Sequence, residues 1–179
     1  MSDFYQTGTI STLHRLNRNN VSQLESELEE FCATRPIALV LPCLYSELKR
    51  KALRDILKKL KDVKYLNEIV ITLGRANEAE FRHAQEYFSI LPQNYKIIWD
   101  DGERMTSVFN LLKENRLHAG DPGKGRAAWI AYGYVLAGEE SEVIALHDCD
   151  ILTYSRELLA RLCYPLANPN MDYEFCKGY

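Results

Sequence analysis

Val143-Ile144-Ala145-Leu146-His147-Asp148-Cys149-Asp150-Ile151 is an apolar run that ends in two aspartates one residue apart. Apolar and β-branched residues in a short run are typical of a strand that is buried on both faces of a sheet. Because side chains of an extended chain alternate between faces, we expect Asp148 and Asp150 to project to one side and His147 and Cys149 to the other. Paired carboxylates suit Mg²⁺ or Mn²⁺, although the same pattern also describes a strand that simply ends in water.

Helical and extended patterns alternate along the rest of the chain. The patterns predict strands at 37–41, 68–74, 95–99 and 142–146, with helices at 22–31, 46–61, 77–88, 103–115, 126–137 and 155–163 and an extended segment at 173–179. Ser22 and Glu25 are expected to form a capping box on the first helix. Regular alternation indicates βαβ units. The expected fold is therefore α/β, a Rossmann-like, open and mainly parallel sheet with helices on both faces.

Length and composition narrow the class of protein. The 179 residues predict a single domain, and the net charge of -3, from 22 basic and 25 acidic residues, argues against a nucleic-acid binder. No apolar run is long enough for a membrane span, and the polar start Met1-Ser2-Asp3 lacks the features of a signal peptide, so a cytoplasmic location is expected. The five cysteines show no C-x-x-C spacing, which favours reduced packing residues over zinc ligands.

Three loops are expected to surround one crevice. In an open α/β sheet, ligands bind beyond the carboxyl ends of the strands. The loop Pro42-Cys43-Leu44-Tyr45-Ser46-Glu47 is expected near a nucleoside, and Asp148 and Asp150 are expected to face its phosphates through a metal ion. Gly123-Lys124-Gly125 would place an ammonium at the start of a helix, where the dipole favours anions. A flexible Gly-Pro connection is the alternative interpretation of this loop.

Two well-known nucleotide motifs are absent from the sequence. A P-loop would need glycine where His118 stands and Ser or Thr where Gly125 stands, and no G-x-G-x-x-G follows the first strand. The turn Asp100-Asp101-Gly102 allows two interpretations, a donor contact or a simple turn. Trp129 is expected in the core.

Several motifs in a fixed order resemble a known family. They are the Leu41-Pro42 strand end with the nearby Glu47, and the four stretches Gly8-Thr9-Ile10-Ser11-Thr12-Leu13-His14, Gly123-Lys124-Gly125-Arg126-Ala127-Ala128-Trp129, His147-Asp148-Cys149-Asp150-Ile151 and Phe175-Cys176-Lys177-Gly178-Tyr179. Together they resemble nucleotide-sugar glycosyltransferases of the GT-A fold, and within them the glucosyl-3-phosphoglycerate synthases and their mannosyl relatives. The resemblance covers most of the chain.

The resemblance implies an activity and a set of site residues. The activity is retaining, metal-dependent transfer of a hexose, expected to be glucose, from a nucleotide sugar such as UDP-glucose to a small phosphorylated acceptor such as 3-phosphoglycerate, in glucosylglycerate biosynthesis. Leu41, Pro42 and Glu47 would contact uridine and its ribose. Gly123 and Lys124 would contact the donor, and Asp148 and Asp150 would hold the sugar nucleotide and Mg²⁺ or Mn²⁺. Lys124 and Asp150 are the expected catalytic groups, with Asp150 the closer metal ligand.

The sequence also departs from the family pattern. Leu73-Gly74-Arg75-Ala76 stands where relatives often carry an acidic residue and a serine-rich turn. The resemblance implies that relatives continue beyond a position matching Tyr179 with the acceptor site, so residues 1–179 are expected to form one nucleotide-sugar-binding domain that binds donor only. The alternatives are a nucleotidyltransferase acting on a sugar phosphate and a non-catalytic nucleotide-binding domain. A homodimer is left open.

Overall fold

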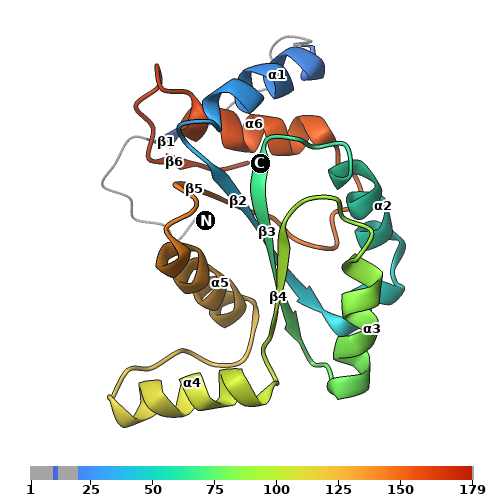
Figure 1. The fold of residues 1–179 in the computed structure, drawn as a ribbon, viewed down its shortest axis with the longest axis vertical. Coiled ribbons are helices and arrows are strands. Elements are labelled where there is room, and N and C mark those ends of the chain that lie inside the picture. Colours follow the sequence, from blue (N-terminus) through green and yellow to red (C-terminus); the bar gives the residue numbers. More distant parts are fainter. Residues whose placement is uncertain (1–9, 12–19, 179) are drawn as a thin grey trace.

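The computed structural model describes residues 10–11 and 20–178, which contain a four-stranded parallel sheet between two layers of helices (Figure 1). The strand order is β4-β3-β2-β5. The strands are β2 (Ile37–Leu44), β3 (Leu66–Gly74), β4 (Tyr95–Trp99) and β5 (Val143–Leu146). Every neighbouring pair in this sheet is parallel. The predicted open α/β sheet is confirmed.

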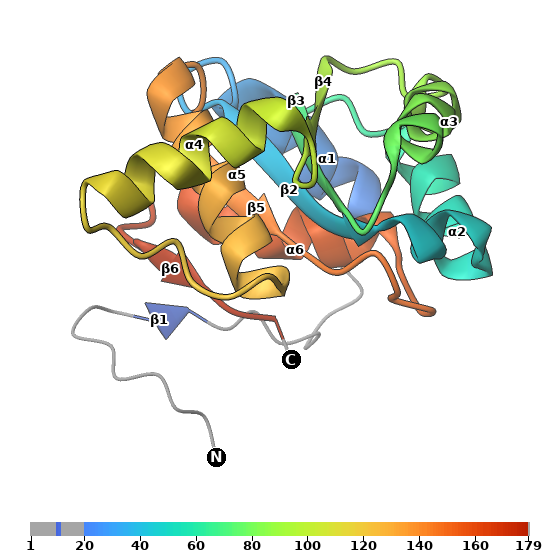
Figure 2. The ribbon, with the colours of Figure 1, turned by 90° about the horizontal axis from the view of Figure 1, so that it is seen from below.

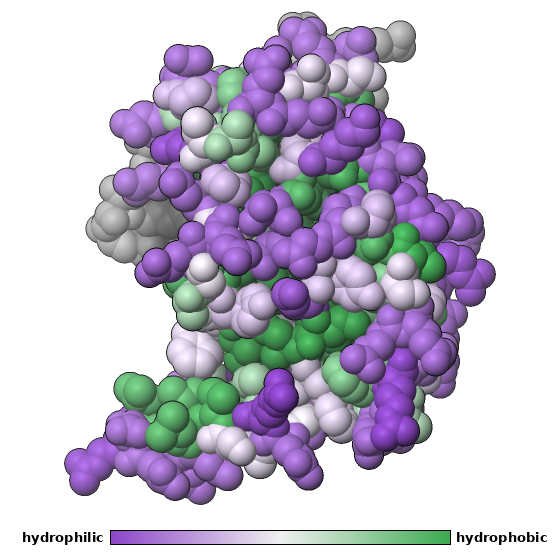
Figure 3. Space-filling model, in the orientation of Figure 1, coloured by the Kyte–Doolittle hydropathy of each residue, from purple (hydrophilic) through white to green (hydrophobic). Residues whose placement is uncertain are grey.

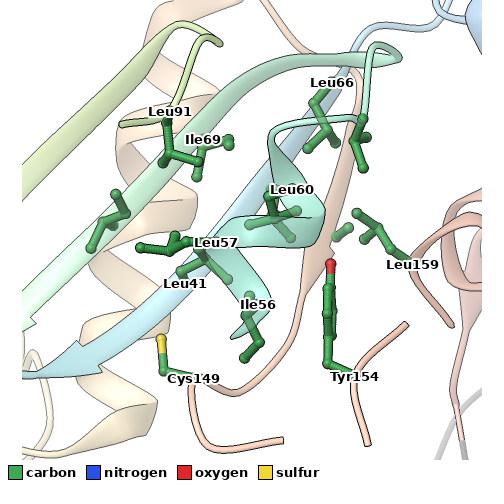
Figure 4. Close-up of a cluster of buried hydrophobic side chains, with 14 of the residues drawn as sticks. Leu41, Ile56, Leu57, Leu60, Leu66, Ile69, Leu91, Cys149, Tyr154 and Leu159 are labelled. Atoms are coloured by element: carbon green, nitrogen blue, oxygen red, sulfur yellow. The ribbon is translucent and has the colours of Figure 1, made fainter. Parts of the chain in front are cut away.

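Helices cover both faces of the sheet, as predicted (Figures 1 and 2). One face carries α1 (Val21–Phe31), α2 (Lys51–Leu60), α3 (Glu78–Phe88) and α6 (Arg156–Ala167), and the other carries α5 (Lys124–Gly138) with α4 (Glu103–Glu114) beside it. The larger core lies under the four helices, and part of it is drawn in Figure 4, where Ile56, Leu57 and Leu60 of α2 meet Leu41 and Ile69 of the sheet.

The central strand β2 shows why the core forms on both sides. Leu39 and Leu41 point into the larger core, whereas Ala38 and Val40 point to the opposite face, where they pack against α5. All four side chains are fully buried. A strand with apolar residues at every position can be buried only in the middle of a sheet that is covered on both faces.

The segment 46–61 folds as two elements rather than the single predicted helix. A 3-10 helix, η1 (Tyr45–Lys49), precedes α2, and Arg50 between them is extended. Buried apolar residues continue across this break, because Leu48, on η1, is buried like the apolar residues of α2. Glu47 lies on η1, directly after β2, and lines a pocket that Gly74 at the end of β3 also lines.

The predicted cap of the first helix is wrong. The N-cap is Asn20, whose side chain accepts a hydrogen bond from the Ser22 backbone N–H at 3.2 Å. Glu25 does not fold back on the helix start. Its carboxylate is buried and pairs with Arg156 of α6, with 2.8 Å between Arg156 Nε and Glu25 Oε1. Glu25 therefore pairs with Arg156 of another helix instead of capping its own helix.

The two ends of the described chain meet in a small parallel sheet, in which β1 (Ile10–Ser11) pairs with β6 (Phe175–Cys176). The extended segment predicted at 173–179 is thus a strand only at residues 175–176. Most of the motif Gly8-Thr9-Ile10-Ser11-Thr12-Leu13-His14 lies outside the described residues. α6 runs beyond the predicted end at residue 163, through Pro165 to Ala167.

Trp129 is not a core residue, contrary to the prediction, because 52% of it is exposed. It belongs to a group of exposed apolar side chains on α4, α5 and the loop between them, which also includes Val108, Leu111, Leu117 and Leu136. Green surface over α4 marks part of this group in Figure 3. None of the described helices is long and apolar enough to cross a membrane.

Candidate functional site

A pocket of about 320 Å³ lies at the carboxyl ends of all four strands of the main sheet. Leu44 ends β2 and Gly74 ends β3, while Asp100 follows β4 and Asp148 follows β5, and all four residues line the pocket. The first turn of α5 closes one side of it. A concave site at this edge of a parallel sheet is where α/β proteins bind ligands.

The wall formed by the end of β2 and by η1 contains two of the residues expected at a nucleoside. Pro42 and Glu47 both line the pocket. Glu47 Oε1 lies 3.3 Å from Arg50 Nη1, whereas Glu47 Oε2 is buried and has no hydrogen-bond partner in the described part of the chain. An unpaired buried carboxylate oxygen is an acceptor that a ligand hydroxyl could satisfy. Leu41, by contrast, is fully buried in the core and does not line the pocket.

The wall from α5 contains Gly123 and Lys124, as expected. Gly123 is the N-cap and offers no side chain to the first backbone N–H groups of this 15-residue helix. These groups and Lys124 make a positive end that suits an anion. Lys124 Nζ forms an ion pair with Asp148 Oδ1, and both side chains remain partly exposed, at 55% and 41%.

The predicted alternation after β5 holds only in part, and the strand itself stops at Leu146. Asp148 and Asp150 line the pocket, and so does the buried Cys149. His147 is buried and does not line the pocket, and its ring lies 4.8 Å from that of Tyr154. Burial lowers the pKa of His147, so the imidazole is neutral near pH 7. The Cys149 thiol has a raised pKa because of its hydrogen bond with Cys43 and its burial.

Four more charged residues line the pocket. The sequence allowed two interpretations of the two aspartates and gave no prediction for the two arginines. Asp100 and Asp101 of the turn after β4 both line the pocket, together with Arg75 and Arg126. Asp101 also has a structural role, because its Oδ2 accepts a hydrogen bond from the Ala76 N–H at 3.0 Å. The strand-end position was the signal for the aspartates. No sequence signal marked the two arginines.

The residues present are compatible with a magnesium or manganese site completed by a ligand. The described residues contain no group of three or more His, Cys, Asp or Glu side chains that could hold a metal ion alone. Asp148 and Asp150 nevertheless share one pocket. Mg²⁺ typically uses one or two carboxylates and takes its remaining oxygens from substrate phosphates and water. Two acids therefore fit a metal that arrives with a phosphorylated ligand.

No protein-family model matches the chain. It is 45% identical over 179 residues to the glucosyl-3-phosphoglycerate synthase of Persephonella marina, covering 100% of this chain and 44% of the relative. The glucosyl-3-phosphoglycerate synthase of Methanococcoides burtonii is 36% identical over 178 residues, covering 99% of this chain and 43% of the relative. The chain therefore spans less than half the length of the curated relatives that it matches.

Solved structures with the same fold come from Mycobacterium tuberculosis. The glucosyl-3-phosphoglycerate synthase in complex with UDP has a TM-score of 0.55 and 19% identity, covering 91% of this chain and 49% of that chain. Its complex with Mn²⁺ and UDP-glucose also has a TM-score of 0.55, at 18% identity, covering 93% and 49%. The chain thus has the same fold as these solved structures.

Proposed function

We propose, from the homology of this whole chain to the glucosyl-3-phosphoglycerate synthases, that residues 1–179 form the donor-binding domain of such an enzyme. The activity of the protein is then transfer of glucose from a nucleotide sugar, UDP-glucose or a similar donor, to 3-phosphoglycerate. Because the chain matches less than half of each curated relative, we assign donor binding to it and leave the acceptor residues unassigned.

One observation carries this proposal. Pro42, Glu47, Gly123, Lys124, Asp148 and Asp150 come from three separate parts of the chain and line one pocket at the carboxyl edge of the sheet. Six of the seven residues expected at the donor therefore share one pocket, whereas Leu41 is buried in the core. Scattered surface residues would not converge in this way.

The pocket divides into a nucleoside side and a phosphate side. We assign Glu47 Oε2, which is buried and has no hydrogen-bond partner among the described residues, to a ribose hydroxyl. Lys124 and the first N–H groups of α5 bind the diphosphate, because both favour negative charge. Asp148 and Asp150 would hold Mg²⁺ or Mn²⁺ together with the ligand. The metal would supply Lewis-acid stabilisation of the leaving diphosphate.

Transfer breaks the bond between sugar C1 and the diphosphate oxygen, which keeps the electron pair. A hydroxyl oxygen of the acceptor forms the new bond to C1 from the same face, and its proton passes to a departing phosphate oxygen, so configuration is retained. We assign Lys124 to stabilise the departing phosphate oxygen as its negative charge grows. No protein nucleophile is needed in this scheme, and the buried thiol of Cys149, with its raised pKa, is not one.

We also place the protein in the cytoplasm. All five cysteines fall in the described part of the chain, and none forms a disulfide. Buried thiols suit a reducing compartment.

Titration calorimetry tests donor and metal binding. We expect UDP-glucose to bind the chain more tightly with Mn²⁺ than without it, and Asp150→Ala to remove most of that metal dependence. Asp172→Ala, at an exposed position outside the pocket, is the control. An affinity for UDP-glucose that changes neither with Mn²⁺ nor with Asp150→Ala would contradict the metal role. Binding of UTP with a sugar phosphate in preference to UDP-glucose would instead favour a nucleotidyltransferase.

A further inference from the structure

Asp100 and Arg126 are two oppositely charged residues that line the pocket. Neither has yet been assigned a role in binding the donor or the metal. Asp100 is only 8% exposed, and its Oδ1 is buried without a hydrogen-bond partner in the described structure. The Nε atom of Arg126 is likewise buried and without a partner. Within the described residues no ion pair joins the two side chains, although both line the same pocket. Each therefore keeps an unused hydrogen-bonding atom.

Neighbouring contacts fix the backbone of Asp100 and the side chain of Arg126. The backbone N–H of Asp100 donates to the Leu73 carbonyl at 2.9 Å, which continues the pairing of β3 with β4. The guanidinium carbon of Arg126 lies 4.3 Å from the centre of the Phe109 ring of α4. The cation-π contact holds Arg126 from the α4 side, and the strand end holds Asp100. A ligand group could then meet both without rearranging the backbone.

The position of the pair within the pocket indicates which part of a donor it would meet. Asp148 and Lys124 mark the phosphate side at β5, whereas Asp100 follows β4, at the other edge of the sheet. Three strand spacings separate these edges, about 14 Å. A nucleoside diphosphate with its phosphates near β5 and its ribose near Glu47 would direct its base toward β3 and β4.

The turn after β3 leaves room there for a base. A Cβ atom added to Gly74 would lie 3.6 Å from Leu44 Cδ2 and 4.0 Å from Asp100 Oδ2, so even a small side chain would enter this part of the pocket. This turn lacks the acidic residue and serines expected from the family pattern. A residue that recognises the base by hydrogen bonds must therefore come from another element.

We propose that Asp100 and Arg126 read the nucleobase of the donor, an inference that rests on the proposed function. Asp100 Oδ1 accepts a hydrogen bond from a ring N–H, and the Arg126 guanidinium donates to the neighbouring carbonyl oxygen. Uracil offers this pair as N3–H and O4, and guanine offers it as N1–H and O6. The corresponding ring nitrogens of cytosine and adenine carry no hydrogen. Asp100 and Arg126 are then specificity-determining residues that select a nucleobase with a ring N–H beside a carbonyl group.

The electrostatics agree with this assignment. Burial raises the pKa of Asp100, while Arg126 opposes that rise. A buried carboxylate without a partner carries a desolvation cost, which a ligand N–H would offset.

A chemical probe tests the proposal without any change to the protein. 3-Methyluridine diphosphate differs from UDP by a methyl group that replaces the N3 hydrogen. We expect titration calorimetry with Mn²⁺ to show that the unaltered chain binds the methylated nucleotide about tenfold to a hundredfold more weakly than UDP. Equal affinity for the two nucleotides would overturn the proposal.

Variants assign the effect to the two residues. Asp100→Leu should weaken UDP by a similar factor, and methylation of N3 should then add little, because the shared contact is already lost. Arg126→Met should also weaken UDP. Neither variant should change the affinity for inorganic pyrophosphate with Mn²⁺, and Asp172→Leu should change nothing. A methylation penalty that persists in full in Asp100→Leu would overturn the assignment of Asp100, and weaker pyrophosphate binding by Arg126→Met would move Arg126 to the phosphates.

The same measurements separate this inference from the function on which it rests. If the unaltered chain binds neither UDP nor pyrophosphate, the donor site itself is wrong, and the inference falls with it. If it binds both but ignores methylation of N3 and the change at Asp100, only the reading of the base is wrong.

Discussion

Lys124, the first residue of α5, forms an ion pair with Asp148, which follows β5. Without a ligand, the lysine therefore neutralises one of the acids that we assign to the metal. A divalent cation that arrives alone must displace the ammonium, whereas a cation that arrives with a diphosphate offers the ammonium new anionic partners. The pair thus couples binding of metal to binding of nucleotide.

Lys124→Ala should separate these two affinities in opposite directions. We expect Mn²⁺ alone to bind more tightly, because its competitor is gone, and UDP with Mn²⁺ to bind about tenfold more weakly, because a charge-assisted contact is lost. Manganese titration followed by UDP calorimetry would measure both. Lys64→Ala, at an exposed position outside the pocket, is the matched control. Loss of both affinities together would contradict the competition.

The contact between Glu25 and Arg156 should matter for stability, not for binding. It joins α1 to α6, and the Glu25 side chain is 8% exposed. Glu25→Ala leaves Arg156 without this partner, and we expect the free energy of unfolding to fall by about 2 to 4 kcal/mol. Urea denaturation would measure it, with the exposed Glu29→Ala as the control on the same helix. A loss no larger than that of Glu29→Ala would show that the pair is dispensable.

Alkaline pH should destabilise the fold through Cys32. Burial raises the pKa of this thiol to about 11 from an ordinary value of 9.0. Because the folded pKa lies above the unfolded one, the contribution to stability is complete below about pH 9 and is lost as pH rises toward 11. Urea midpoints at pH 8 and pH 10.5 should show this fall. Cys32→Ala should reduce it, and an identical fall in the variant would exclude Cys32 as a source.

Asp100 should lower the stability of the protein without a ligand. Its pKa is raised by burial, so the protonated carboxyl is favoured by folding, and that advantage is lost as pH rises through the folded pKa. Asp100→Asn should therefore raise the free energy of unfolding by about 1 kcal/mol at pH 7. The gain should shrink below about pH 4, where both states are protonated. Thermal unfolding across this range would measure it, and destabilisation at pH 7 would mean that the carboxylate has a partner.

The sequence predicted the sheet well because each strand contains a run of apolar residues. The stretches around Leu39, Val70 and Ile144 contain more apolar residues than an element at the surface would. They therefore predicted strands that are buried on both faces of the sheet. Helix ends were predicted less well. Asn20 and Ser22 are both good caps, and the choice depended on whether Glu25 was needed elsewhere, which only the position of Arg156 decides.

The candidate site was predicted where residues lie at strand ends and missed where they depend on packing. Pro42 lies near the end of β2 and Asp148 follows β5, so the topology of the sheet alone brings them together. Arg126 lines the pocket from the first turn of α5 while its guanidinium packs on the Phe109 ring of α4, and Trp129 of the same helix is exposed. The hydrophobic pattern of the sequence predicts neither position. Leu41 shows the opposite case, a residue at the right strand end whose side chain belongs to the core.

The pairing of β2 with β5 also has a kinetic meaning. It joins residues as distant along the chain as Ile37 and Val143, while β2 and β3 are much closer in sequence. Closing the longer loop costs more entropy, and contacts between distant residues slow folding. We expect β5 to join the sheet after the other strands have paired. Asp148 and Asp150 would then arrive last, so a newly made chain would gain its core before it could recognise a metal-bound nucleotide.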